Sequence, residues 1–183
     1  LGDVYKRQIL ITAAFYLFFI TLRDFFHRKY RNLSQITAHF SFSILILSIL
    51  FNNIFSSEVI TNLKINETYQ AQNLKINFES IEQENKQNFK AIKGKFIVED
   101  QSGLIEVMQP ELRIYNQPNI VTSEADIKTN IFTDKFMTMN YVQNQDYFNI
   151  RYQVKPFMIW IWISTILLCL SGCLSLIRKK YEN

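Results

Sequence analysis

Few side chains in this 183-residue sequence are of the kinds that bind metals or act as nucleophiles. The chain has two histidines and two cysteines, and the block from Ser56 to Lys155 contains neither type. That block therefore cannot form a Ser-His-Asp or Cys-His site, or a usual metal centre with nitrogen or sulfur ligands. Its carboxylates lie mostly at turns or alternate strand positions, which is typical of a solvated face. The four glycines form no phosphate-binding loop.

His39 is the residue with the clearest chemical potential. It lies about one turn into an uncharged, apolar run, with Ser43 following on the same helical face. An ionisable side chain in a membrane segment is costly and is usually held against another helix. On the residues alone, two readings stay open: a hydrogen bond that packs two helices, or a functional role such as a proton relay or an axial haem ligand. His27 lies among basic residues, where we expect it to be solvated.

Both cysteines lie in the last apolar run, as Cys169-x-x-x-Cys173, one helical turn apart. A thiol pair that handles haem or copper is one interpretation. The favoured interpretation is structural, because cysteine is small and apolar and stands here beside Ser171 and Gly172, which suits helix packing in lipid. The block from Ser56 to Lys155 has no cysteine, so its stability cannot rest on disulfides.

Two uncharged runs are long enough to cross a bilayer, and we predict transmembrane helices over residues 36–55 and 156–177. Basic residues precede the first in the loop 23–35, and Arg178, Lys179 and Lys180 follow the second in the tail 178–183. Positive residues mark the cytoplasmic side of a membrane, so we expect both clusters there and the intervening block outside. Trp160 and Trp162 stand where an interfacial aromatic belt is expected.

A third apolar run, residues 9–22, is too short for a full span, and we interpret it as a truncated transmembrane helix. The charged octapeptide 1–8 before it resembles an assembly remnant and is left out of the fold prediction. With no initiator methionine, the chain is expected to be the C-terminal piece of a longer polytopic protein.

The net charge of +4 reflects this topology. The block from Ser56 to Lys155 carries eleven basic and thirteen acidic residues, a net charge of −2, whereas Arg23 to Gln35 carries four basic residues and one acid. A nucleic-acid-binding domain would have its basic residues clustered on the soluble face, so we predict no nucleic-acid partner.

The block of residues 56–155 is predicted to be an extracytoplasmic β domain, a small antiparallel barrel or sandwich inserted into an α-helical polytopic membrane protein. Alternating apolar and polar residues indicate six strands, at 58–65, 69–78, 89–98, 104–115, 135–142 and 147–154. Glu99 to Gly103 is a turn signal, and Glu82 to Lys86 is predicted to be a solvated loop. Val121 to Thr129 is predicted to be a short helix, with Thr122 or Ser123 as its cap.

Four short motifs carry a resemblance to a known family. They are, in order, Pro110-Glu-Leu-Arg-Ile-Tyr115, Thr122-Ser-Glu-Ala125, Thr133-Asp134, and Arg151-Tyr-x-x-Lys-Pro-x-x-x-Trp-Ile-Trp162. With the helices around them, they resemble the C-terminal region of the CcmF family, the haem-handling membrane subunit of cytochrome c maturation. The resemblance covers nearly everything after residue 8. The chain has Ser41 and Ser164 where the family commonly has glycine, and both are small enough for close helix approach.

The resemblance implies a haem-handling function. CcmF proteins take haem from a CcmE-type chaperone and act with CcmH-type partners that present reduced apocytochrome c, which receives haem through thioether bonds. The family also holds a haem b between two membrane histidines. His39 matches one of these axial ligands to the haem iron, and the other is expected upstream of this chain. The fragment would be a component of a haem lyase complex, but not a lyase by itself.

The resemblance also implies a location and a binding surface. We expect a bacterial inner membrane with residues 56–155 in the periplasm, or alternatively a mitochondrial inner membrane. The stretch from Pro110 to Thr133 is read as a poorly strand-like loop that faces a partner, with Glu111, Arg113, Tyr115 and Glu124 as candidate contacts. A local ion pair of Arg113 with Glu111 or Glu124 is the plainer reading. Rival functions are a membrane-anchored docking module and, less favoured, a solute sensor or transporter accessory domain.

Overall fold

The computed structural model describes residues 2–26, 33–71, 74–100, 103–142 and 145–182 of the chain. It divides into two compact units. The helical unit comprises Leu1–Ser56, Asn130–Asp134 and Lys155–Asn183, and the β unit comprises Ser57–Thr129 and Lys135–Val154.

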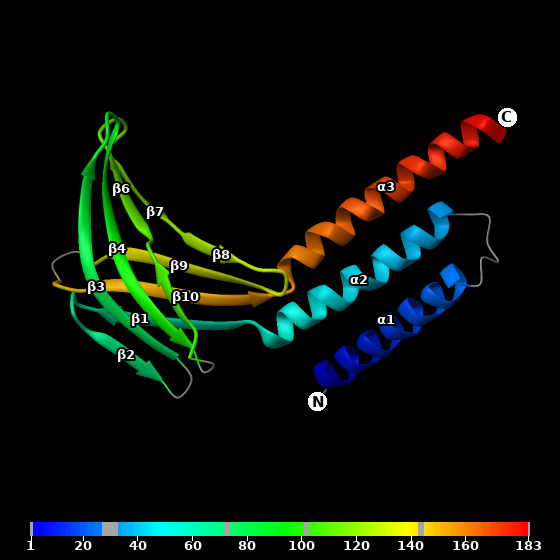
Figure 1. Ribbon diagram of the computed structural model, residues 1–183, viewed down its shortest axis with the longest axis horizontal. Coiled ribbons are helices and arrows are strands. Elements are labelled where there is room, and N and C mark those ends of the chain that lie inside the picture. The colour runs from blue at the N-terminus through cyan, green and yellow to red at the C-terminus, as the bar shows by residue number, and fades with distance from the viewer. Residues whose placement is uncertain (1, 27–32, 72–73, 101–102, 143–144, 183) are drawn as a thin grey trace. The chain divides into compact units, whose positions relative to one another are not determined.

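The helical unit has three helices, α1 (Gly2–Phe26), α2 (Leu33–Phe55) and α3 (Met158–Glu182), and α2 packs against both others (Figure 1). Among the described residues, α2 and the Met158–Ile177 part of α3 are long and apolar enough to cross a membrane. α1 begins at Gly2, so the stretch set aside as an assembly remnant continues the helix predicted over 9–22. α3 continues to Glu182, past the predicted end of the span at 177. The basic loop residues Arg28, Lys29 and Arg31, and His27 with them, lie outside the described residues.

Serines fill the contact between α2 and α3. Ser41 and Ser164 are fully buried, as their small size predicted, and Ser171 is nearly so. The hydroxyl of Ser34 donates to the backbone carbonyl of Ser171 at 2.7 Å, which joins the two helices directly. Small side chains let helix backbones approach closely where no hydrophobic effect drives them together. On the other side of α2, the Phe40 ring stacks with that of Phe18 on α1 at a centroid distance of 5.4 Å.

A tight corner precedes α3. Phe157 has a positive φ of 61°, which is unusual for a residue with a large side chain. Its amide donates to the carbonyl of Phe132 at 2.7 Å, and its ring packs against Phe51 of α2. The side-chain amide of Asn52 donates to the carbonyl of Pro156 at 2.6 Å. The indole of Trp160 donates to the carbonyl of Ile131 at 2.9 Å, so this corner is fixed by hydrogen bonds on several sides.

The β unit consists of two sheets. One has the strand order β1 (Ser57–Leu63), β10 (Phe148–Pro156), β9 (Thr133–Tyr141), β8 (Asp126–Thr129). The other has the order β2 (Thr68–Ala71), β3 (Leu74–Asn85), β4 (Phe89–Asp100), β6 (Glu111–Tyr115), β7 (Ile120–Glu124), and β5 (Ile105–Met108) also pairs with β4. Every strand pair with a described register is antiparallel. The fold is a β-sandwich, one of the two forms predicted.

The core of the sandwich is apolar and comes from both sheets. Phe78 of β3 and Phe96 of β4 are directly opposite in the register and stack with centroids 4.3 Å apart. Around them lie further buried side chains: Leu63, Ile76, Val98, Met108, Leu112, Met137, Met139, Ile150 and Tyr152. The alternation of buried and exposed residues along these strands is the pattern from which the sequence predicted them.

Four sequence predictions in this unit were wrong. Val121 to Thr129 is not a helix but belongs to β7 and β8, because β6 offers backbone pairing from Glu111 to Tyr115 that a helix could not use. The Pro110 to Thr133 stretch is therefore largely strand rather than loop. Glu82 to Lys86 is not a free loop either, since β3 runs to Asn85 in register with β4. The strand predicted over 104–115 is broken into β5 and β6 around Pro110, which has no N–H to donate.

Candidate functional sites

His39 lines a cavity between α1 and α2 of about 310 Å³. Its side chain is exposed within the described part of the chain. The other lining residues are Leu17, Ile20, Thr21 and Asp24 from α1 and Gln35 and Ile36 from α2. Gln35 precedes His39 by four residues, so both lie on one face of α2. An apolar wall with a few polar groups and one imidazole is thus formed by the hairpin of α1 and α2.

The donor set at this cavity suits one axial position of a haem. An imidazole nitrogen is a common haem-iron ligand, and apolar side chains beside it favour a buried macrocycle. Within the described residues, no group of three or more His, Cys, Asp or Glu side chains could hold a metal ion by itself. His39 is the only imidazole among the residues that line this cavity, so these residues could supply one nitrogen ligand to a haem iron.

Within the described residues, the two cysteines do not lie in the contact of α3 with α2, and their packing in a longer protein stays a prediction. Cys169 and Cys173 are free thiols, and both are exposed in the described structure. The residues that α3 buries against its neighbour are the serines at 164 and 171 instead. The cysteine pair is thus a small apolar strip on the outer face of α3.

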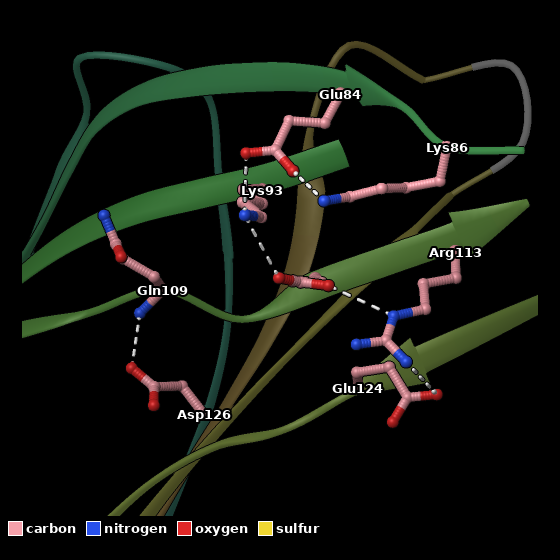
Figure 2. A network of polar contacts seen from close by, with 8 residues as sticks. Glu84, Lys86, Lys93, Gln109, Arg113, Glu124 and Asp126 are labelled. Carbon is pink, nitrogen blue, oxygen red and sulfur yellow. Dashed lines mark hydrogen bonds and ion pairs between the residues drawn. The ribbon is translucent and has the colours of Figure 1, made fainter. Parts of the chain in front are cut away.

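A ladder of alternating charges crosses the outer face of the six-stranded sheet. Each member contacts the next in the order Lys86, Glu84, Lys93, Glu111, Arg113, Glu124. Figure 2 shows the labelled members pointing toward one another from neighbouring strands. The shortest contact joins Lys93 Nζ to Glu84 Oε1 at 2.9 Å, and the longest joins an Arg113 guanidinium nitrogen to Glu124 Oε1 at 4.0 Å. Three cations and three anions alternate, so the ladder is neutral as a whole.

Strand register explains why these side chains meet. Lys93 stands opposite Glu111 in the pairing of β4 with β6, and Glu111 stands opposite Glu124 in the pairing of β6 with β7. Two carboxylates directly opposite would repel each other, and Arg113 relieves this by contacting both. The Arg113 guanidinium also lies 5.1 Å from the centroid of the Phe89 ring, a cation–π contact.

The ladder shifts the acid–base behaviour of its members. The hydrogen bond from Lys93, with that from Lys86, lowers the pKa of the Glu84 carboxyl, and the bond to Glu84 raises the pKa of Lys93. Hydrogen bonds with Glu111 and Tyr115 raise the pKa of Arg113. Each of these shifts favours the charged form of the side chain, the carboxylate of Glu84 and the cations of Lys93 and Arg113. This arrangement is a paired, solvated surface and not an acid–base site.

A second charge cluster lies nearer the core. The ammonium of Lys135 is 2.7 Å from Glu106 Oε2 and 3.6 Å from Asp100 Oδ2, and its side chain is only 12% exposed. Burial, together with the negative charges of Glu106 and Asp100, raises the pKa of the nearby Tyr152 hydroxyl to about 12. Because the cluster is partly buried and its charges are paired, we expect it to contribute to the stability of the β unit.

The four predicted contact residues lie together. Glu111, Arg113 and Tyr115 alternate along β6 and so share one face, and Glu124 is beside them on β7. The local ion pairs that were the plainer reading of Arg113 are present. Sequence reasoning did not predict that Glu84 of β3 and Lys93 of β4 belong to the same ladder, although charged residues alternate along both strands. It also missed Asp24, the one acid between Ile9 and Phe26, as a neighbour of His39.

Residues 54–156 match the family described as the CcmF C-terminal beta-sandwich. The match spans more than half of the chain and includes every strand of the two sheets. The chain belongs to the CcmF family. This confirms the resemblance carried by the motifs after Pro110.

Several CcmF relatives align with the chain beyond the β unit. A cytochrome c-type biogenesis protein, ccl1 of Rhodobacter capsulatus, is 29% identical over 120 residues, which are 66% of this chain and 18% of that protein. CcmF of Haemophilus influenzae is 24% identical over 167 residues, 88% of this chain and 26% of that protein. CcmF of Escherichia coli is 23% identical over 149 residues, 81% and 23% respectively. The chain thus spans about a fifth to a quarter of the length of these relatives.

A solved structure, described as cytochrome c heme lyase CcmF, has the same fold. Its TM-score with this chain is 0.59 at 17% sequence identity, and the match covers 76% of this chain and 23% of the other. The fold prediction is confirmed for a β-sandwich joined to two apolar helices of membrane-spanning length.

Proposed function

We propose that the chain is the C-terminal part of the haem-handling membrane subunit for cytochrome c maturation. In this role it supports the transfer of haem from a CcmE-type chaperone to apocytochrome c, for thioether attachment with a CcmH-type partner. The observation that carries the proposal is the CcmF match over residues 54–156. The charge ladder and the lack of histidine and cysteine in residues 56–155 support a binding rather than a catalytic task for the β unit.

The proposed location is the bacterial inner membrane, with residues 56–155 in the periplasm, or the mitochondrial inner membrane with the same orientation. The lengths and hydropathy of α2 and α3 support two crossings. The basic residues of the sequence before α2 and after Ile177 support cytoplasmic ends.

We further propose that His39 is one axial ligand of a haem b and that the second ligand comes from the part of the protein upstream of this chain. When bound, such a haem supplies a one-electron redox centre within the membrane. His39 would supply an imidazole nitrogen from α2, and Leu17, Ile20 and Ile36 would supply apolar contacts beside it. Thr21, Asp24 and Gln35 are available to fix the orientation of the imidazole.

The outer face of β6 and β7 is the proposed partner surface, with Glu111, Arg113, Tyr115 and Glu124 as contacts. Arg113→Ala should weaken co-purification with the CcmH-type partner while the amount of protein in the membrane stays the same. Lys75→Ala, which breaks one exposed ion pair at 3.8 Å elsewhere on the unit, is the matched control. Loss of the Arg113→Ala protein from the membrane would instead show that Arg113 is needed for the stability of the protein.

The function is tested with a strain that lacks the full-length gene. In this strain, denaturing gels stained for haem should show no c-type cytochromes. The stained bands should return when the wild-type gene is supplied. His39→Ala should fail to restore them and should lose or shift the reduced haem absorbance of the purified protein, whereas His27→Ala should do neither. Unchanged covalent haem in the deletion strain would contradict the proposed function. Unchanged haem in the His39→Ala protein would contradict the ligand assignment alone.

A further inference from the structure

The cavity at His39 brings a carboxylate to the same space as the imidazole. Asp24 comes from the last turn of α1, and His39 from the second turn of α2. The Asp24 side chain is 23% exposed, although it follows a run of apolar residues. A carboxylate that is partly withdrawn from water needs hydrogen-bond donors, and Arg23 supplies one of them.

Three side chains at the cavity could accept a hydrogen bond from the imidazole. The Thr21 hydroxyl is buried and already donates to the carbonyl of Leu17 at 2.6 Å. Gln35 is neutral and lies on the same helix as His39. Asp24 is the strongest acceptor, because a carboxylate only accepts and carries a charge. Its contact with the neighbouring Arg23, at 3.3 Å, engages the Oδ1 atom.

We propose that Asp24 is the positioning residue of His39. Asp24 and His39 line the same cavity, so with haem bound the Asp24 carboxylate would accept a hydrogen bond, through one water, from the imidazole nitrogen that does not ligate the iron. This bond fixes the tautomer and the ring orientation and makes the ligating nitrogen more basic. The proposal rests on the proposed role of His39 as a haem ligand.

A purely structural role for Asp24 makes different predictions. If Asp24 only pairs with Arg23 to end α1, its loss would lower the amount of folded protein without changing the bound haem. A hydrogen-bonded carboxylate instead stabilises the ferric state, since it increases electron donation from the imidazole. Its removal should therefore raise the midpoint potential of the haem. The potential is thus a readout that a structural role would not move.

The test uses the purified full-length protein with its haem. Asp24→Ala should raise the midpoint potential and weaken haem retention by about 10- to 100-fold. Asp24→Glu, which keeps an acceptor, should restore much of both. Arg23→Gln is the control for the charge alone: it removes the neighbouring cation but keeps the acceptor, and it should shift the potential far less than Asp24→Ala.

The outcomes separate this proposal from the one on which it rests. If His39→Ala loses haem while Asp24→Ala keeps the wild-type potential and retention, Asp24 is not the positioning residue and His39 remains the ligand. If Arg23→Gln shifts the potential as far as Asp24→Ala, in the opposite direction, the effect is one of net charge and the hydrogen bond is excluded. If His39→Ala keeps its haem, both assignments fall together.

Discussion

The two units bury opposite kinds of side chain. In the β unit, aromatic and aliphatic residues such as Phe78 and Phe96 are fully buried, and charged ladders cover the outside. In the helical unit, Ser41 and Ser164 are fully buried, while large apolar residues such as Ile166 and Leu170 are exposed. The first pattern is that of a protein in water. The second is expected when the surroundings are themselves apolar, because packing of small residues then replaces the hydrophobic effect.

The largest expected effect concerns the core of the β unit. Phe96→Ala should remove its stacking with Phe78 and leave a cavity, which typically costs about 3–5 kcal/mol. Resistance of the β unit to protease in isolated membranes measures the loss. Ile105→Ala, at a position that is 65% exposed, is the control and should stay within about 1 kcal/mol of the wild type. Equal protease resistance in the two variants would mean that this core does not stabilise the unit.

In the helical unit, adding apolar volume to the buried contact of α2 with α3 should destabilise the protein. Ser164→Leu places a large side chain in the buried contact of α2 with α3, and overpacking of this kind costs roughly 1–3 kcal/mol. Cys169→Leu adds similar volume at an exposed position and should have little effect. Thermal stability of the detergent-solubilised protein distinguishes the two. If the Ser164→Leu protein were the more stable, this helix contact would follow the rules of a water-soluble core.

One glycine in each unit shows the same difference in packing. A Cβ atom at Gly94 would lie 2.6 Å from a Phe96 ring carbon and 2.8 Å from the Met139 sulfur, whereas nothing lies within 4 Å of a Cβ at Gly172. Gly94→Ala should therefore destabilise the β unit by about 1–3 kcal/mol. Gly172→Ala should be neutral or slightly stabilising, since alanine favours a helix. A neutral Gly94→Ala would show that the core accommodates the added methyl group.

The smallest effect is a pH dependence of the β unit. Because the pKa of Tyr152 is raised to about 12 in the folded protein, from 10.0 for a free side chain, the folded state holds a proton that the unfolded state loses. Stability should be unaffected below about pH 9 and should fall as the pH rises from about 10 to 12, by roughly 2.7 kcal/mol at most. Tyr152→Phe should remove this part of the alkaline loss. Tyr141→Phe, at an exposed position, should leave the alkaline loss of stability unchanged. An identical alkaline loss in both variants would exclude Tyr152 as the source of that loss.

The sequence contains enough local information to predict many of the elements. Alternation along Phe148 to Tyr152 predicts a strand, and the uncharged run after Thr37 predicts a membrane helix, because both signals depend on near neighbours. The prediction of a helix over Val121 to Thr129 was wrong because it, too, depended only on near neighbours. Its cap-like residues are a local signal, and the pairing partner that overrides it, β6, begins ten residues earlier in the chain.

The candidate sites show the same limit. His39 stands out in the sequence as an ionisable residue in an apolar run, but its neighbour Asp24 becomes visible only when α1 and α2 form a hairpin. Likewise, the alternating charges of β3, β4 and β6 cannot be paired before the register is known. Single residues can be selected from local patterns, whereas their partners depend on tertiary structure.

The contrast between the two units is tested most directly by finding the side of the membrane on which the β unit lies. Gln87, in the exposed turn between β3 and β4, can be replaced by cysteine in a full-length protein with no other cysteines, and Asn183→Cys provides the opposite marker. A membrane-impermeant maleimide added to intact spheroplasts should label position 87 at once and position 183 only after lysis. Labelling at 183 but not at 87 would contradict the proposed orientation. Equal labelling of both before lysis would contradict the membrane crossing by α3, the helix between the two positions.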